Sequence, residues 1–599
     1  MRTSDLATGP GDEPVNDTEH ELLAAAIAGT IIDLRAGDTE PDNPGLGATW
    51  GAERHIRADL LAALLTGTAS SHGKPPRAIK LRGARIIGTL NLEAANLTCP
   101  LLLEDCYIDE PVNLTEATAP SIRMLGCRLP SLTARQLCTT HNLSLDAATF
   151  TRGVTLSGAH IGGTLSMVGT KLHSLSGSRL TVEQNMICRH GFTASGEVRL
   201  VGAHIGGQLD LSGATLANWR WALYGDGLTV DQDLDAERLS AHGQIRLSTA
   251  RIAGELRLSG ANLTGSPALD ADSLSVGQNM ICRHGFTADG EIILRGARIA
   301  GRLDLSGAHL TSTNSPALTA DGLTIEQDMI CRSGRTVDDS LQARRFTVKG
   351  KISLVGSRIS GKLDLTTASL ANPSGSALCL QAANVADLLL LPGHRPDGDV
   401  DLTHARVGIF EDDPATWPEA LCLRDFTYDS LSNQQVSVRR RLEWLARNQG
   451  GYLPQPYDQL VAAYKRAGDE QAARKVAIAK QRRRRRAYSP LSWLWYLTVG
   501  YGYRPWLAGA WALALAAVGT AVFSHAYPAH MIATSPHPPA FHAAAYALDL
   551  LLPVIGLGQK SAWQPQESAY QYWSWVLTGA GWVLTTAVVA GLTGILKRD

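Results

Sequence analysis

Large aliphatic residues recur through the middle of the chain at steps of five to eight residues. An amphipathic helix places apolar residues three and four apart, whereas steps near five with local Leu-x-Leu alternation indicate short strands joined by turns. The pattern therefore predicts stacked coils of short strands, each coil about 23 or 24 residues long. The predicted core positions of three successive units are Leu200, Ile205, Leu211, Leu216, Leu247, Ile252, Leu258, Leu263, Leu294, Ile299, Leu305 and Leu310.

The same region contains two nested repeats. The segment from Gln184 to Phe192 (QNMICRHGF) returns from Gln278 to Phe286, 94 residues later. Smaller units begin at Gly196, Gly243 and Gly290, 47 residues apart, so the long period is two short ones. A fixed period of this size is typical of a solenoid, in which glycine and other small residues occupy tight corners.

Short Ala-x-Leu or Ala-x-Ile tripeptides accompany the corners. With these tripeptides the chain resembles the pentapeptide-repeat proteins. The resemblance implies a mainly β protein with a right-handed parallel β-helix, four-sided and with helical caps, over residues 78–426 in some fifteen coils. Steps of six, seven and eight depart from the strict five of that family and imply bulged corners. The tripeptides are Ala95-Asn96-Leu97, Ala203-His204-Ile205, Ala261-Asn262-Leu263 and Ala308-His309-Leu310.

Helices are predicted at both ends of the β-helix, because the terminal coils of a solenoid need caps. Residues 1–77 form an acidic tail and a helical N-cap, with helices over Glu19–Leu34 and Ala52–Leu65. Residues 434–487 form a basic helical connector, with helices over Gln434–Asn448 and Pro456–Arg486. The segment Pro456–Arg486 contains a turn at Ala467-Gly468-Asp469.

Residues 488–599 are predicted to form a membrane domain, a C-terminal transmembrane α-hairpin. Its spans lie at about 506–527 and 572–596, with an intervening helix at 541–552. Trp506–Phe523 carries no charged residue over 18 positions and Tyr572–Leu596 none over 25, which is long enough to cross a bilayer. Two buried helices of a soluble domain are the alternative, which the Trp and Tyr residues near the ends of the segments disfavour.

Charge sets the expected orientation of the hairpin. A run of five arginines precedes the first span, and Lys597 and Arg598 follow the second. Positive residues remain on the cytoplasmic side, so we expect a multi-pass protein of the cell (inner or plasma) membrane with its N-terminal domain and C-terminus in the cytoplasm. The juxtamembrane basic residues are Arg482, Arg483, Arg484, Arg485 and Arg486.

Overall composition excludes some partners. Lys and Arg number 55 against 56 Asp and Glu, a net charge of −1, and residues 434–490 alone hold 14 basic against 4 acidic residues. The neighbouring membrane span explains the excess positive charge of residues 434–490, so no nucleic-acid partner is predicted. The numbers of acidic and basic residues in the repeat region are too similar for it to imitate the charge of a DNA duplex. The nine cysteines form no C-x-x-C pair, which favours reduced thiols in a cytosolic compartment.

The repeated Cys-Arg-His at Cys188–His190 and Cys282–His284 invites a metal or catalytic interpretation. Four coils at about 4.8 Å each separate the copies by roughly 19 Å, too far for a shared metal. A third copy reads Cys331-Arg332-Ser333. We therefore interpret the motif as structural repetition and assign no catalytic, cofactor-binding or metal-binding residue.

Three aspartates, Asp210, Asp304 and Asp364, share one repeat position after a leucine. Long β-helices can act on carbohydrates through carboxylates on one face, but repetition also explains a solvated stripe. Chains of this kind are sometimes labelled membrane-associated oxidoreductases. The sequence contains no dinucleotide fingerprint, haem motif or iron–sulfur spacing, so no cofactor is predicted.

The order of elements between the spans resembles that of a two-span ion channel: a span, a short helix, a glycine-containing loop and a second span. The candidate pore loop follows Phe541–Leu552 and contains Pro553, Gly556 and Gly558. It lacks the Thr and Tyr of a potassium filter. A literal Thr-Val-Gly-Tyr-Gly at 498–502 precedes the first span, where no pore helix can present it.

Three functions follow as hypotheses. The first is a membrane-anchored cytoplasmic β-helix scaffold or interaction protein, without an identifiable catalytic site, that binds a protein partner. The second is a regulatory β-helix coupled to a homo-oligomeric two-span pore. The third is a membrane-associated oxidoreductase, which no cofactor motif supports.

Overall fold

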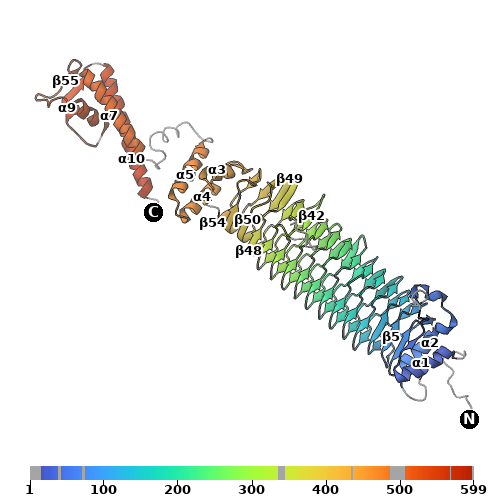
Figure 1. Ribbon diagram of the computed structural model, residues 1–599. Helices are drawn as coiled ribbons and strands as arrows, with labels where there is room; N and C mark the ends of the chain where they lie inside the picture. The colour runs from blue at the N-terminus through green and yellow to red at the C-terminus, as the bar shows by residue number, and fades with distance from the viewer. Residues whose placement is uncertain are drawn as a thin grey trace, which may run out of the picture. The chain divides into compact units, whose positions relative to one another are not determined.

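The computed structural model describes residues 15–37, 42–69, 75–334, 344–432, 436–485, 506–552, 554–566 and 568–596. The chain divides into two compact units, Met1–Gly451 and Tyr452–Asp599. Most strands belong to the first unit, and the long helices belong to the second (Figure 1).

The first unit is a parallel β-solenoid of about 16 turns (Figure 1). Its strands form two sheets of 27 strands each. A representative coil contains β16 (His160–Ile161), β17 (Leu165–Ser166), β18 (Lys171–Leu172) and β19 (Ser174–Ser176). Each strand pairs in parallel with its counterparts in the coils before and after, so main-chain hydrogen bonds run from coil to coil.

Coil length varies around the predicted value. His160 pairs with Thr181, Thr181 with His204 and His204 with Thr229, so each of these coils is slightly longer than the one before it. The inward neighbours of these residues stack in a column that includes Ile161, Val182, Ile205 and Val230. All twelve predicted core positions lie inside the solenoid, each at most 3% exposed.

The extra residues of the longer coils collect at one corner, between the β18-type and β19-type strands. From β26 (Thr215–Leu216) onward this corner alternates between long and short coils. Leu216 and Leu223 flank a long corner, Ala241 and Ile245 a short one, and Leu263 and Leu269 a long one. The 47-residue repeat is therefore one coil with a long corner followed by one with a short corner.

The backbone of each long corner lies directly against a glycine in the short corner of the next coil. Gly243 and Gly290 have φ of +123° and +127°, a backbone conformation that L side chains rarely adopt. A Cβ atom on Gly243 would lie 1.8 Å from the carbonyl oxygen of Asn218, and one on Gly290 would lie 1.7 Å from that of Gly265. The repeated glycines are thus required by close approach of the neighbouring coil.

The N-terminal cap contains helices and two strands that join the sheets. Helix α1 (Asp17–Ala28) ends at Gly29, whose φ is +73°, so the prediction of helix through Leu34 was wrong beyond Ala28. Strand β1 (Ile32–Asp33) pairs with β3 (Ile79–Arg82). Residues 52–57 form a 3-10 turn and β2 (His55–Arg57), so α2 begins only at Ala58 and continues to Thr66.

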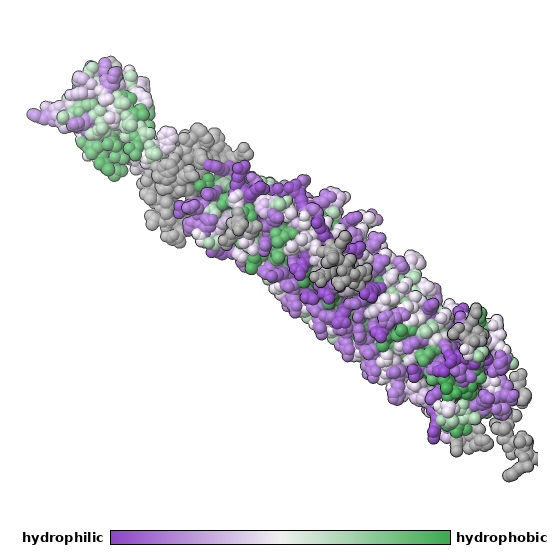
Figure 2. Space-filling model, viewed as in Figure 1, coloured by the Kyte–Doolittle hydropathy of each residue, from purple (hydrophilic) through white to green (hydrophobic). Residues whose placement is uncertain are grey.

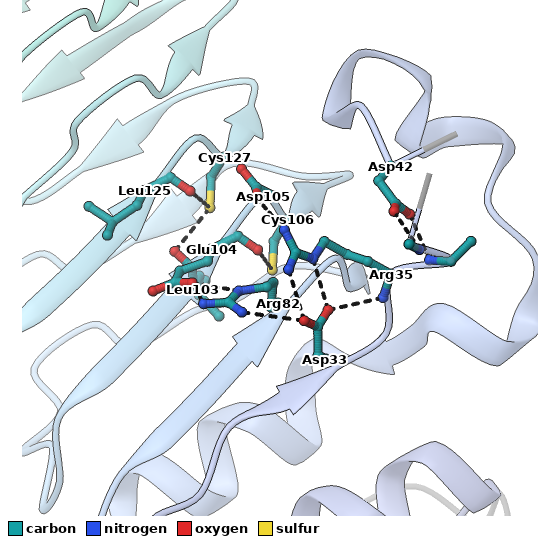
Figure 3. A network of polar contacts seen from close by, with 12 residues as sticks. Asp33, Arg35, Asp42, Arg82, Leu103, Glu104, Asp105, Cys106, Leu125 and Cys127 are labelled. Atoms are coloured by element: carbon teal, nitrogen blue, oxygen red, sulfur yellow. Dashed lines mark hydrogen bonds and ion pairs between the residues drawn. The ribbon is translucent and has the colours of Figure 1, made fainter. Parts of the chain in front are cut away.

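A polar network ties this cap to the first coils (Figure 3). Asp33 accepts a hydrogen bond from Arg35 Nε at 2.9 Å and one from Arg82 at 3.3 Å. Arg82 also donates to Glu104 at 2.6 Å, and Arg35 lies 3.5 Å from Asp105. Hydrogen bonds from Arg35, the largest influence, hold the pKa of Asp33 down at about 2.

The C-terminal end of the solenoid is covered by α3 (Val438–Ala446), which follows β54 (Thr427–Leu431). Arg441 of this helix donates to Asp412 at 2.6 Å, and both side chains are buried. The indole N–H of Trp417 donates to the same carboxylate oxygen at 2.8 Å. This buried ion pair fastens the cap to the last coils.

The second unit is mainly helical. Helices α4 (Pro454–Arg466) and α5 (Glu470–Arg485) flank the predicted turn at 467–469. Further along lie α7 (Trp506–Ala526), β55 (Met531–Ala533), α8 (Ala543–Leu551), α9 (Gln559–Ala562), β56 (Trp563–Pro565) and α10 (Ser568–Leu596).

A small core joins α7, α8 and α10. It contains Phe523, Tyr546, Leu550 and Leu577. Gly581 of α10 lies against the end of α8, where an added Cβ would be 2.2 Å from the carbonyl oxygen of Leu551. Small residues permit such close helix contacts inside membranes as well as in water.

Candidate functional site

The cysteines of the repeated Cys-Arg-His are core residues. Cys188, Cys282 and Cys331 are at most 1% exposed. Burial, followed by the charge of nearby aspartates, raises the pKa of each thiol well above its usual range. His190 and His284 adopt positive φ at the corner that follows. The motif therefore supplies a core side chain and a turn, and it provides no thiolate.

The arginines of the motif pair with the repeated aspartates. Arg189 lies 3.1 Å from Asp210 in the next coil. The corresponding distances are 3.9 Å from Arg283 to Asp304 and 3.6 Å from Arg332 to Asp364.

Backbone hydrogen bonds also hold the carboxylates of these three aspartates in place. Each accepts a hydrogen bond from the backbone N–H two residues later, at 2.9–3.0 Å. The aspartate column is thus a ladder of ion pairs between coils, and its carboxylates are occupied by structural contacts. Within the described residues no group of His, Cys, Asp and Glu is arranged to hold a metal ion.

A recess of about 310 Å³ lies on the outer surface of the corner between β18-type and β19-type strands. Here several consecutive coils have short corners, so no loop covers the surface. It is lined by Phe150, Thr151, Lys171, Leu172, His173, Thr193, Ala194, Ser195, Thr215 and Ala217. Its polar groups are four hydroxyls, one ammonium and one imidazole, and none of the lining residues is acidic.

The imidazole in the recess has a fixed position. His173 Nδ1 lies 3.0 Å from the hydroxyl of Ser195. The ring rests on Gly196, where an added Cβ would lie 3.1 Å from both Cε1 and Nε2. Within the described part of the chain Nε2 has no hydrogen-bond partner and Lys171 forms no ion pair. The recess therefore presents two unengaged nitrogen groups, and its lining adds four hydroxyls, of which that of Ser195 contacts His173 Nδ1.

The first long corner bounds the recess. Ala217 lines it, and two residues later Trp219 is 85% exposed. The guanidinium of Arg220 stacks over Trp221 at 4.2 Å, and Asn218 accepts a hydrogen bond from the backbone of Arg220 at 3.2 Å. The loop is thus braced while its first tryptophan points into solvent.

Hydrophobic residues gather on the surface of the part of the second unit that contains α7 and α10 (Figure 2). One helix among the described residues, at Gly509–Ala526, is long and apolar enough to cross a membrane, and 17% of that segment is buried. The predicted second segment is helical in α10, but a two-span hairpin is not confirmed. Exposed apolar side chains include Leu513 at 74%, Tyr572 at 63% and Trp575 at 60%.

The candidate pore loop follows α8 directly. Asp549 of α8 is buried and accepts hydrogen bonds from the backbone N–H groups of Leu557 and Lys560, both at 2.8 Å. These bonds fix the loop, and Gly558 has a φ of +77°. Val554 is 82% exposed, while Gly556 has nothing within 4 Å of its added Cβ position. Pro553 lies outside the described residues.

The juxtamembrane arginines begin on α5, which ends at Arg485. Arg482, Arg483 and Arg484 are accessible to solvent. Arg486, Lys597, Arg598 and the segment at 498–502 lie outside the described residues. Lys480 of the same helix donates to Asp458 of α4 at 2.5 Å, which joins the two helices.

Comparison with known proteins gave no family model, no curated protein and no solved structure that matches this chain.

The residues around the recess were not predicted from the sequence. One signal was available: Asn218–Trp221 reads NWRW, whereas the corresponding long corners contain GSPA, STNSPA and ANPSGSA. A tryptophan that interrupts a regular repeat and is then exposed is not explained by packing.

Proposed function

We propose that this protein is a membrane-anchored scaffold whose β-solenoid presents a long side-chain surface to a protein partner on the cytoplasmic side. The observation that carries the proposal is the exposed apolar helix at Gly509–Ala526 in the same chain as a regular solenoid. A helix of this composition is costly to leave in water and is stable in a bilayer.

The internal roles of the repeated polar residues support a binding function over an enzymatic one. The Cys188 and Cys282 thiols fill the core, and the aspartate column is engaged in ion pairs and turns. The solenoid's main-chain groups pair along its axis, so a partner bound to its side meets side chains only. We further propose that the coil is right-handed and of the pentapeptide-repeat type.

The arginine run beginning at Arg482 sets the proposed orientation and leaves the solenoid in the cytoplasm. A single reporter tests it, because Cys138 is the one exposed cysteine of the nine. In inside-out vesicles a membrane-impermeant maleimide should label this residue, and in intact cells it should not. Labelling in intact cells would contradict the orientation, and Cys138→Ser is the control.

Anchoring is tested separately by carbonate extraction of membranes. The wild-type protein should stay in the membrane fraction. The double variant Leu513→Asp, Val518→Asp places two charges in the span at about 2.5–3.5 kcal/mol each and should move toward the soluble fraction. Release of the wild-type chain by carbonate would refute a spanning anchor. Crosslinking from the solenoid surface in cells then tests for the partner.

An oligomeric pore is a second candidate, favoured by the braced loop after α8. The exposed side chains of Val554, Ile555 and Leu557 would be covered by neighbouring copies around an axis. This proposal predicts a symmetric oligomer in detergent and ion flux into liposomes that changes with Gly556→Ala. A monomer without flux would eliminate it.

A further inference from the structure

We propose that the recess beside Lys171 and His173 binds an anionic saccharide, a sugar that carries a phosphate or carboxylate group. The inference is independent of membrane anchoring. It rests on the lining of the recess, the unengaged nitrogen groups and the exposed tryptophan on the bounding loop.

Charge defines one end of the ligand. Lys171 and His173 are two residues apart in the same coil, and the lining of the recess contains no carboxylate to neutralise their nitrogen groups. An ammonium and an imidazole nitrogen both donate hydrogen bonds to phosphate or carboxylate oxygens. The recess therefore accepts an anion and repels a cation.

Hydroxyl groups define the rest of the ligand. Thr151, Thr193, Ser195 and Thr215 contribute hydroxyls from three of the four coils that line the recess. Hydroxyls donate and accept, so they match a polyhydroxyl molecule better than an apolar one. A volume of about 310 Å³ accommodates a single sugar ring with its charged substituent.

Trp219 lies on the loop that bounds the recess, two residues after the lining residue Ala217, and its indole is free to contact a ligand. Its 85% exposure has no counterpart in the other long corners, which contain no aromatic residue. The apolar face of an indole ring packs against the apolar face of a sugar ring, as aromatic side chains commonly do at binding surfaces. The loop around it is braced by Arg220 and Asn218, so little ordering is needed on binding.

A second histidine in the solenoid provides an internal control. His242 Nδ1 lies 3.2 Å from the hydroxyl of Thr264, the same arrangement as His173 with Ser195. Its coil lies beneath the Asn218–Trp221 loop, and Ser240 stands where the recess has Lys171. The His242 site therefore has the same imidazole–hydroxyl pair without the ammonium group.

The test is calorimetric titration of the full-length protein in detergent with glucose 6-phosphate, glucuronate, glucose and inorganic phosphate. We expect one or both anionic sugars to bind more tightly than glucose or phosphate. Lys171→Gln and His173→Gln should each weaken binding about tenfold or more, since each removes a hydrogen bond to a charged group. Trp219→Ala should weaken binding of the sugars but leave binding of inorganic phosphate unchanged.

The matched control is His242→Gln, which removes the same kind of side chain at the same corner and should leave binding unchanged. Circular dichroism and resistance to protease establish that each variant is folded. Equal binding of inorganic phosphate and the sugars would overturn the proposal, as would an unchanged affinity in folded Lys171→Gln.

Discussion

Replacing Gly290 by alanine tests the account of the nested repeat. The glycine has a φ of +127°, and an added Cβ would lie 1.7 Å from the carbonyl oxygen of Gly265 and 3.1 Å from the nitrogen of Ala268. Both contacts are with backbone, so no side-chain rotation relieves them. The preceding long corner has to move away from the coil.

The magnitude follows from two contributions. An alanine held in this backbone region costs about 1–3 kcal/mol. Displacing a packed loop costs about 1–3 kcal/mol more. We therefore expect Gly290→Ala to lower the free energy of unfolding by about 2–6 kcal/mol. Gly213→Ala is the matched control, because Gly213 has a φ of +64° and nothing within 4 Å of the added Cβ position. It should cost about 1–2 kcal/mol.

Hydrogen exchange measured by mass spectrometry is the suitable assay, because coils contact mainly their neighbours and open locally. Peptides covering residues 262–293 should lose protection in Gly290→Ala, while peptides near the N-terminal cap should not. Shortening the loop at Gly265–Pro267 in the same variant should restore part of the stability, which a double-mutant cycle measures. Equal losses in Gly290→Ala and Gly213→Ala would refute the reasoning.

Three further predictions concern the caps and the core. Arg441→Ala should destabilise the C-terminal cap by about 3–5 kcal/mol in urea unfolding, since it leaves Asp412 buried without its ion pair. The pKa of Asp33 is lowered to about 2, so its contribution to stability is complete above about pH 4 and is lost as the pH falls toward 2. Asp33→Asn should therefore flatten acid unfolding in that range. Iodoacetamide should leave Cys188 and Cys282 unmodified until the protein is denatured, and rapid modification of the native protein would contradict their burial.

The steps between aliphatic residues were sufficient to predict the stacked strands and the core. Leu200, Ile205 and Leu211 lie inside the solenoid because inward and outward residues alternate along each short strand and into the residue that follows it. The secondary structure of the N-terminal cap was harder to predict from the sequence. His55–Arg57 is flanked by helical segments in the sequence and becomes a strand only because β4 (Arg85–Ile87) lies beside it.

Contacts between coils could not be predicted from local pattern. Arg189 and Asp210 belong to different motifs in the sequence, and they meet because one full turn of the solenoid brings their positions side by side. The recess depends in the same way on corner lengths in successive coils. Only Trp219 departed visibly from the repeat, and its exposure is set by the loop's path, which the sequence alone does not define.

The alternating corner also determines where this protein tolerates added length. The long corners at Gly265–Ala268 and Ser312–Ala317 differ in size, yet the strands that follow them keep their parallel pairing. Successive long corners are two coils apart, or about 10 Å at the usual strand spacing. Foreign peptides grafted at these two corners would be displayed about 10 Å apart along the solenoid, which makes it a scaffold that sets the spacing between inserted epitopes.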